Sequence, residues 1–435
     1  MMSEKKRIMA LLCLVYRIAI DYYYYNHVAP FWAYAGLTRD FSLEKTIISY
    51  TICAFIFLVI NWDDNEIYNN VLQSMYAIII IPLLSFYGLS NKQTSFAIAC
   101  SIGFLITILL ANSSANKHTT LSLGQLSRIK HMDVIAIGML VLTVLYMLRL
   151  YGLHLDVIDI LGPSVYDLRR AQSSIHASGL MGYLIVWSYK IICPLFLALS
   201  LSQKKKFLTV FFASLQILMY LASPHKEILF SIVLIIGAYY ATKKRVFSYG
   251  LIGGITGLLI LDSLTIKNGV GNVISATLRR LLFYPAAIKY EHFTYFSGHN
   301  KLFFSEGILG RLLGIKYEYG SMSTGQVIAA YFHGTVSNSN TGYLAYAYDD
   351  LGFLGIILAS ILVAILIIVL QRIVSERNKV FIFSVAIYPF IELNDLSLLT
   401  MVLTGGLAVL ILVAILLEIK PEKRIANSLG SSVDT

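Results

Sequence analysis

Basic and histidine side chains gather in one long polar stretch of the chain, between about residues 266 and 350. Arginine binds phosphate oxygens through paired hydrogen bonds, and histidine exchanges a proton near neutral pH. The stretch therefore predicts a site that binds an anion and transfers a proton. Its members are Arg279, Arg280, Arg311, Lys316, His292, His299 and His333.

A second basic group follows a tyrosine earlier in the chain. Tyr166 and Asp167 come shortly before the adjacent Arg169 and Arg170. Two arginines beside a membrane either contact lipid headgroups or recognise a phosphate or diphosphate, and both interpretations remain open here. Lys226, in the short turn 223–227, has the same two interpretations: ordinary surface charge or an anion ligand.

Candidate proton-transferring groups lie in the polar stretch. His333 is either a general base near neutral pH or a surface histidine. Asn340 leads through a glycine-spaced entry toward Asp349 and Asp350. Such a polar entry into an apolar segment is typical of a residue set that lines a cavity.

The stretch from 279 to 296 must position several of these residues. Apolar side chains recur there at helical spacing, which predicts an amphipathic helix lying against the membrane or against the helix bundle. Its aromatic residues form an interfacial belt or stack on sugar rings, and composition does not separate the two hypotheses.

Composition assigns the chain to the membrane proteins. Of its 435 residues, 57% are hydrophobic and only 13% are charged, about half the charged fraction of a soluble domain. The net charge of +10 is explained by basic cytoplasmic loops without any nucleic-acid partner. The four cysteines all lie in apolar segments and predict neither a disulfide framework nor a metal site.

The apolar segments predict an all-α, polytopic membrane protein with about twelve transmembrane helices in one integral membrane domain, residues 1–435. The first is expected to be an uncleaved helix. The expected spans are roughly 8–30, 46–61, 71–89, 94–111, 131–151, 179–201, 206–222, 226–242, 246–263, 351–370, 379–394 and 396–418.

The distribution of lysine and arginine predicts the orientation. With the N-terminus in the cytoplasm, six internal segments carry three basic residues each, whereas the short external segments carry four in total. Both termini are then cytoplasmic, including the tail 419–435. A smaller periplasmic loop covers 152–178, and a large one covers 264–350, between the ninth and tenth spans.

The layout resembles the bacterial O-antigen polymerases of the Wzy type. The resemblance is carried by the run from Tyr166 to Arg170, by Arg279-Arg280 opening the large loop, and by Asn340 leading to the Gly-x-x-Gly of residues 352–355. It also includes the turn 223–226, where Lys226 stands in place of the family's arginine. Related enzymes have a His-Asn pair where this chain has Ser339 before Asn340, and the nearest histidine is His333.

This resemblance implies a membrane glycosyltransferase of the bacterial inner membrane. It implies that one polyprenyl-diphosphate-linked oligosaccharide is the donor and another the acceptor, that no metal or cofactor is needed, and that a flippase and a chain-length regulator are partners. The catalytic residues implied are Arg169, Arg170, Arg279, Arg280 and His333. The substrate-binding residues implied are Tyr166, Lys226, Glu291 and Asn340.

Three other functions share parts of this pattern. A flippase of lipid-linked oligosaccharides also has about twelve spans, but it predicts charges deep within several helices. An O-antigen ligase has the same layout with a different acceptor, and the absent His-Asn pair speaks against it. A sensor would use the loop only to bind a partner. The concentration of charge in two external loops favours an enzyme.

Overall fold

The computed structural model describes residues 4–115, 132–158, 163–172, 175, 177, 179–265 and 273–418. Within these ranges the chain is helical without a β-strand, and one isolated bridge pairs Asp40 with Ser90. The predicted all-α fold is confirmed. The basic residues Lys117, Arg128 and Lys130 and the tail 419–435 lie outside the described residues.

The helices follow one another along the chain with short connections. They are α1 (Glu4–Tyr23), α2 (Ala29–Trp32), α3 (Leu43–Val59), α4 (Ile67–Met75), α5 (Ile81–Leu89), α6 (Thr94–Ala115), α7 (Met132–Tyr151), α8 (Pro163–Gln172), α9 (Leu180–Trp187), α10 (Cys193–Ser202), α11 (Lys206–Ala222), α12 (Lys226–Lys243), α13 (Phe247–Thr265), α14 (Val273–Leu278), α15 (Tyr284–Ser297), α16 (Ile308–Leu313), α17 (Thr324–His333), α18 (Tyr343–Ile373), α19 (Lys379–Glu392), α20 (Leu398–Leu403) and α21 (Leu407–Glu418).

Eight helical segments in the described part of the chain are long and apolar enough to cross a membrane. The chain is therefore a multi-pass helical membrane protein, as its composition predicts. These segments are Glu4–Ala35, Ile67–Leu89, Thr94–Ser113, Val134–Tyr151, Leu180–Ser202, Phe247–Thr265, Tyr343–Ile373 and Leu398–Leu417.

The four remaining expected spans correspond to shorter or more charged helices. Helices α3 and α11 have 17 residues each and α19 has 14, all short of the usual length. Helix α12 has 18 residues but includes Lys226, Glu227 and Lys243. The count of twelve spans therefore stays a prediction.

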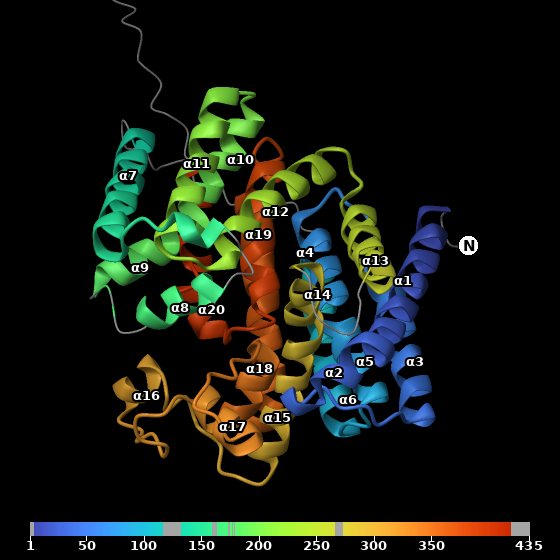
Figure 1. Ribbon diagram of the computed structural model, residues 1–435. Coiled ribbons are helices and arrows are strands. Elements are labelled where there is room, and N and C mark those ends of the chain that lie inside the picture. Colours follow the sequence, from blue (N-terminus) through green and yellow to red (C-terminus); the bar gives the residue numbers. More distant parts are fainter. Residues whose placement is uncertain are drawn as a thin grey trace, which may run out of the picture.

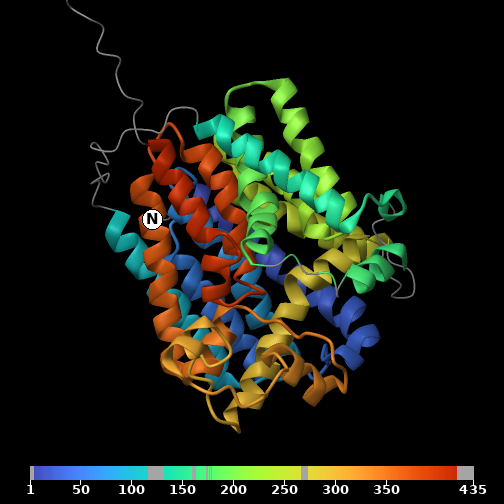
Figure 2. The same cartoon turned by 90° about the vertical axis from the view of Figure 1, so that its left-hand side faces the viewer.

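Neighbouring and distant segments pack together in the bundle. Helix α6 lies against α18, α1 against α13, and α12 against α19. Figure 1 shows α15, α16 and α17 gathered at one end of the molecule, below the long helices. Figure 2 shows the same grouping after the view is turned, so the part of the polar stretch from α15 to α17 forms one structural region.

Four π-helical turns interrupt the apolar helices, and each ends two residues before a proline. They are Tyr24–Val28, Tyr76–Ile80, Ser188–Ile192 and Arg279–Phe283, followed by Pro30, Pro82, Pro194 and Pro285. Proline lacks an amide hydrogen and its ring collides with the carbonyl four residues earlier. A wider turn inserts one residue and relieves that collision. Two of these turns contain Lys190 and the pair Arg279-Arg280.

The segment 273–297 forms one helical rod through α14, the last π turn and α15. The expected helix is present, but it is not a surface helix. Phe283, Tyr290 and Phe296 are each only 1% exposed, so the aromatic residues pack inside the molecule instead of forming an interfacial belt. Helical periodicity predicts that a face is apolar, but it does not tell whether other helices cover the remaining faces.

Candidate functional site

One open stripe runs along the otherwise buried α15 rod. Arg280 and Thr294 are exposed, while Tyr284, Ile288 and Glu291 between them are half-buried. These five positions are spaced three or four residues apart, which places them on one face of a helix. The rod therefore presents a cation and a carboxylate, Arg280 and Glu291, on the same accessible face.

The carboxylate of this stripe pairs with a histidine from α17. His333 Nε2 lies 3.1 Å from Glu291 Oε1 and 3.2 Å from Oε2. The exposed fractions of the two side chains are 19% and 11%. Two residues that the sequence assigned separately, as a base and as a substrate contact, thus form one pair. Because Glu291 accepts from Nε2–H, neutral His333 keeps Nδ1 free to accept a proton.

Local structure fixes both members of the Glu291–His333 pair. Helix α17 begins at a capping box between Ser323 and Gln326, and it ends after His333 with Gly334 in the left-handed conformation. Burial raises the pKa of Glu291 above its ordinary value, while the charges of His333, His292 and Lys92 oppose that rise. The capped end of α17 therefore holds the His333 ring in contact with the Glu291 carboxyl group.

The adjacent arginines of the π turn point to different surroundings. Arg279 is 7% exposed, and its Cζ lies 4.0 Å from the centroid of the Trp32 ring, a cation–π contact. Arg280 is exposed and acts electrostatically on Asp395, in the turn between α19 and α20. Consecutive helical residues diverge in direction, so the two do not form one phosphate fork.

The arginines of α8 also differ from each other. Arg170 Nη2 lies 2.7 Å from Asp167 Oδ1, and the two side chains are 80% and 67% exposed. Arg169 is half-buried and acts electrostatically on His225. Burial lowers the pKa of His225, and Arg169 lowers it further against the opposing charge of Glu227. The side chain of Tyr166 lies outside the description.

Helix α8 is anchored next to the turn that carries Lys226. Gln172 Nε2 donates to the carbonyl oxygen of Ala222, 2.9 Å away, at the end of α11. The turn 223–225 follows directly, and Lys226 is half-buried at the start of α12. The structure therefore brings Arg169 and Lys226, two separately predicted anion ligands, into one region.

A network of charged side chains lies next to the region that holds Arg169 and Lys226. Lys190 Nζ is 2.5 Å from Glu392 Oε1 and 4.0 Å from Glu227 Oε1. The Tyr388 hydroxyl donates to Glu392 Oε1 at 3.0 Å. A lysine in an apolar span generally requires an acidic partner, and Glu392 is that partner here. Glu227 interacts with His225 and with Asp395, so the network links Arg169 to Arg280.

Lys289 ties the α15 rod to the turn between α19 and α20, a role that sequence reasoning missed. Its side chain is fully buried. Its Nζ donates to Asn394 O and Oδ1, each 2.7 Å away, and to Pro285 O at 3.2 Å. Burial lowers the pKa of Lys289 to about 8, against the opposing charge of Asp395. A lysine one helical turn after Pro285, among apolar residues, was the sequence signal.

His292 joins the rod to the loop before α18. Its Nδ1 lies 2.6 Å from Asp349 Oδ2, and its Nε2 lies 3.0 Å from the Ser339 carbonyl oxygen. Both ionisable side chains are fully buried, so this pair is a structural tie and not an accessible base. Asn340, the next residue along the loop, is exposed.

The glycine-spaced entry into α18 contains a backbone kink. Gly352 has φ 65° and ψ −145°, a conformation open in practice only to glycine. Gly355 lies so close to the Ala347 carbonyl oxygen that a Cβ there would be 1.8 Å from it. The glycines therefore shape the start of the span and do not themselves contact a ligand site in the described structure.

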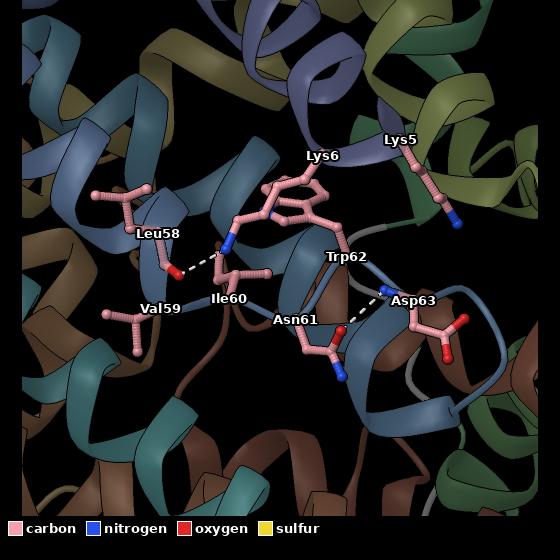
Figure 3. Close-up of a pocket in the computed structure, with 8 residues that line it drawn as sticks. All are labelled: Lys5, Lys6, Leu58, Val59, Ile60, Asn61, Trp62 and Asp63. Atoms are coloured by element: carbon pink, nitrogen blue, oxygen red, sulfur yellow. Dashed lines mark hydrogen bonds between the residues drawn. The ribbon is translucent and has the colours of Figure 1, made fainter. Parts of the chain in front are cut away.

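A polar pocket of about 450 Å³ lies at the other end of the molecule, beside the start of α1. Lys5, Lys6 and residues 58–63 line it. Lys6 Nζ donates to the carbonyl oxygen of Leu58, 2.9 Å away (Figure 3). None of the residues that line it belongs to the site predicted from the sequence.

Comparison of the chain with protein-family models, with curated proteins and with solved structures finds no match. Within the described residues, no three His, Cys, Asp or Glu side chains converge as metal ligands would. The function is therefore argued from the side chains of this chain and their geometry.

Proposed function

We propose that the chain is a membrane glycosyltransferase of the O-antigen polymerase type. It joins oligosaccharide repeat units carried on polyprenyl diphosphate, at the periplasmic face of the bacterial inner membrane. The observation that carries this proposal is the Glu291–His333 pair, which shares the open stripe of α15 with Arg280. A general base and a diphosphate-binding cation on one face are what this transfer needs.

The proposal includes a topology of twelve crossings with both termini in the cytoplasm. The eight long segments supply most of these crossings, and α3, α11, α12 and α19 supply the rest. Residues 264–350 are then the large periplasmic loop, which includes α15, α16 and α17, and α8 belongs to the smaller periplasmic loop, 152–178. The excess of basic residues in internal segments supports this orientation.

The transfer is a displacement at the anomeric carbon of the donor. The acceptor hydroxyl attacks that carbon, His333 Nδ1 takes the hydroxyl proton, and Glu291 stabilises the imidazolium that forms. The bond between the sugar and the diphosphate breaks, and the polyprenyl diphosphate leaves with the bonding electrons. Arg280, Arg169 and Lys226 stabilise the charge that develops on the leaving group.

Donor and acceptor are both lipid-linked glycans, which approach through the membrane. The polar network around Lys190 supports the basic side chains that face the diphosphate, because its carboxylates neutralise neighbouring cations that would otherwise repel one another. A flippase that delivers the donor and a regulator of chain length are the expected protein partners.

The test is a lipopolysaccharide gel of a strain that lacks the gene, with and without the gene restored. Polymerase activity predicts that the ladder disappears, that one repeat unit stays attached to the core, and that restoration returns the ladder. Loss of even the single repeat unit would contradict the proposal and indicate ligation or flipping instead. An unchanged ladder would also contradict it.

A further inference from the structure

Three aromatic rings at the tip of the α15 rod form a corner, here called the aromatic corner: Tyr295, His299 and Tyr331. Tyr295 and His299 stack with their centroids 3.9 Å apart and an interplanar angle of 3°. Tyr331, from α17, stands at 79° to Tyr295 and at 81° to His299. The stacked pair thus forms a floor, and Tyr331 forms a wall.

The upper surfaces of this corner are open while its base is buried. Tyr331 is 64% exposed, whereas Tyr295 beneath is only 7% exposed. His299 is exposed, and its Nδ1 lies 2.7 Å from the Tyr295 carbonyl oxygen, which fixes the ring. Holding the exposed rings of His299 and Tyr331 at a right angle costs side-chain conformational entropy, and little burial of these rings offsets that cost. Packing of the polypeptide alone therefore does not account for the arrangement.

The aromatic corner lies beside the Glu291–His333 pair. Glu291 and Tyr295 are one helical turn apart on α15, and they contact His333 and Tyr331, both near the end of α17. The same two helices therefore hold the proposed base and the corner. A ligand that reaches the base extends to the corner if it is one or two ring units long.

An exposed polar pair adjoins the corner, whose other ring neighbours are Phe296, Tyr319 and Phe332. Asn300 follows His299 directly, and its Nδ2 donates to Glu318 Oε1 at 3.2 Å in an exposed pair. A sugar ring combines a C–H face, which packs on an aromatic ring, with hydroxyls that need amide and carboxylate partners. An acyl chain would need a continuous apolar surface, which this polar pair interrupts.

We propose that the aromatic corner is a glycan subsite that binds the acceptor one sugar beyond its reacting hydroxyl. This inference rests on the proposed function, because His333 must reach the acceptor hydroxyl and the acceptor sugar then lies at the pair. The next ring of the acceptor stacks on His299 against the wall of Tyr331. The corner fixes which hydroxyl faces the base, and it acts on binding of the acceptor and not on the leaving diphosphate.

Binding of a lipid-free oligosaccharide tests the subsite directly. The probe is the repeat-unit oligosaccharide released from the surface polysaccharide of the strain that carries the gene, titrated against the full chain in lipid nanodiscs. Tyr331→Ala and His299→Ala should each weaken binding by about tenfold, as expected for loss of one stacking contact. Tyr331→Phe keeps the ring and should bind as the unaltered chain does.

The control is Val336→Ala, since Val336 is 79% exposed on the same loop but does not belong to the corner. Absence of binding to the unaltered chain, or equal binding by Tyr331→Ala and Val336→Ala, would overturn the subsite. The lipopolysaccharide gel separates this result from the fate of the proposed function. A restored ladder with unchanged binding in Tyr331→Ala refutes the subsite alone. Weakened binding in Tyr331→Ala, together with an unaltered gene that fails to restore the ladder to the deletion strain, retains the subsite and refutes the polymerase.

Discussion

Gly36 packs directly behind the Glu291–His333 pair, and replacing it by alanine should separate that pair. Its φ of 80° lies in the left-handed region, and an added Cβ would stand 2.3 Å from Glu291 Oε1 and 3.4 Å from His333 Cε1. The first distance is far inside van der Waals contact. Gly36→Ala therefore forces the carboxylate away from the position in which it accepts the histidine N–H.

The magnitude follows from two effects. Placing alanine in a left-handed conformation costs about 1–2 kcal/mol. Loss of a hydrogen bond to a charged group costs about 1.5–3 kcal/mol. The first effect acts on stability, and the second acts on the orientation of the base, where it corresponds to a loss of chain growth of roughly 10- to 100-fold.

Gly320→Ala separates these effects. Gly320 has φ 64°, close to that of Gly36, but no atom lies within 4 Å of the Cβ that would be added there. It therefore carries the backbone strain without the collision. The assay is polymer formation in membrane vesicles, scaled to the amount of protein, together with thermal unfolding of each variant. Equal losses of polymer in the two variants would refute the role of the Glu291–His333 pair.

Two further predictions concern the ties that hold the α15 rod. Lys289→Met leaves buried acceptors unpaired and should lower stability by about 1–3 kcal/mol for each acceptor that stays unpaired, measured by chemical or thermal unfolding, whereas Lys316→Met at an exposed position should change little. Burial lowers the pKa of His292, but Asp349 and the Ser339 carbonyl raise it to a net value above the ordinary one. Because the pKa of His292 is higher in the folded than in the unfolded chain, protonated His292 stabilises the fold below about pH 6.5, and this contribution is lost as pH rises through the folded pKa. Thermal stability should therefore decline with rising pH. His292→Gln should remove the decline.

The membrane fold could be predicted from composition because apolar runs of spanning length leave few alternatives. The number of spans stays a prediction, since α3, α11 and α19 are short and α12 carries three charges. The sequence did not predict that other helices bury the α15 rod. Periodicity describes the faces of one helix, while burial depends on which distant helices pack around it.

The residue types of the candidate site could be predicted from the sequence, but which of these residues lie together could not. Glu291 and His333 were both singled out, yet 42 positions separate them, and only the packing of α17 on α15 joins them. The adjacent Arg279 and Arg280 looked like one unit and face different surroundings. The prolines that follow each π turn were a usable signal, because they mark where the helices widen around Lys190 and these arginines.

The central claim is that the Glu291–His333 pair and separate cations, Arg280 on the same open stripe and Arg169 on α8, support glycosyl transfer. The most direct test is the lipopolysaccharide ladder restored by three arginine variants. Arg280→Ala and Arg169→Ala should lose the ladder and retain a single repeat unit on the core, at unchanged protein levels. Arg170→Ala should keep it, because Arg170 is 80% exposed and pairs with Asp167. A normal ladder from Arg280→Ala and Arg169→Ala would contradict the account.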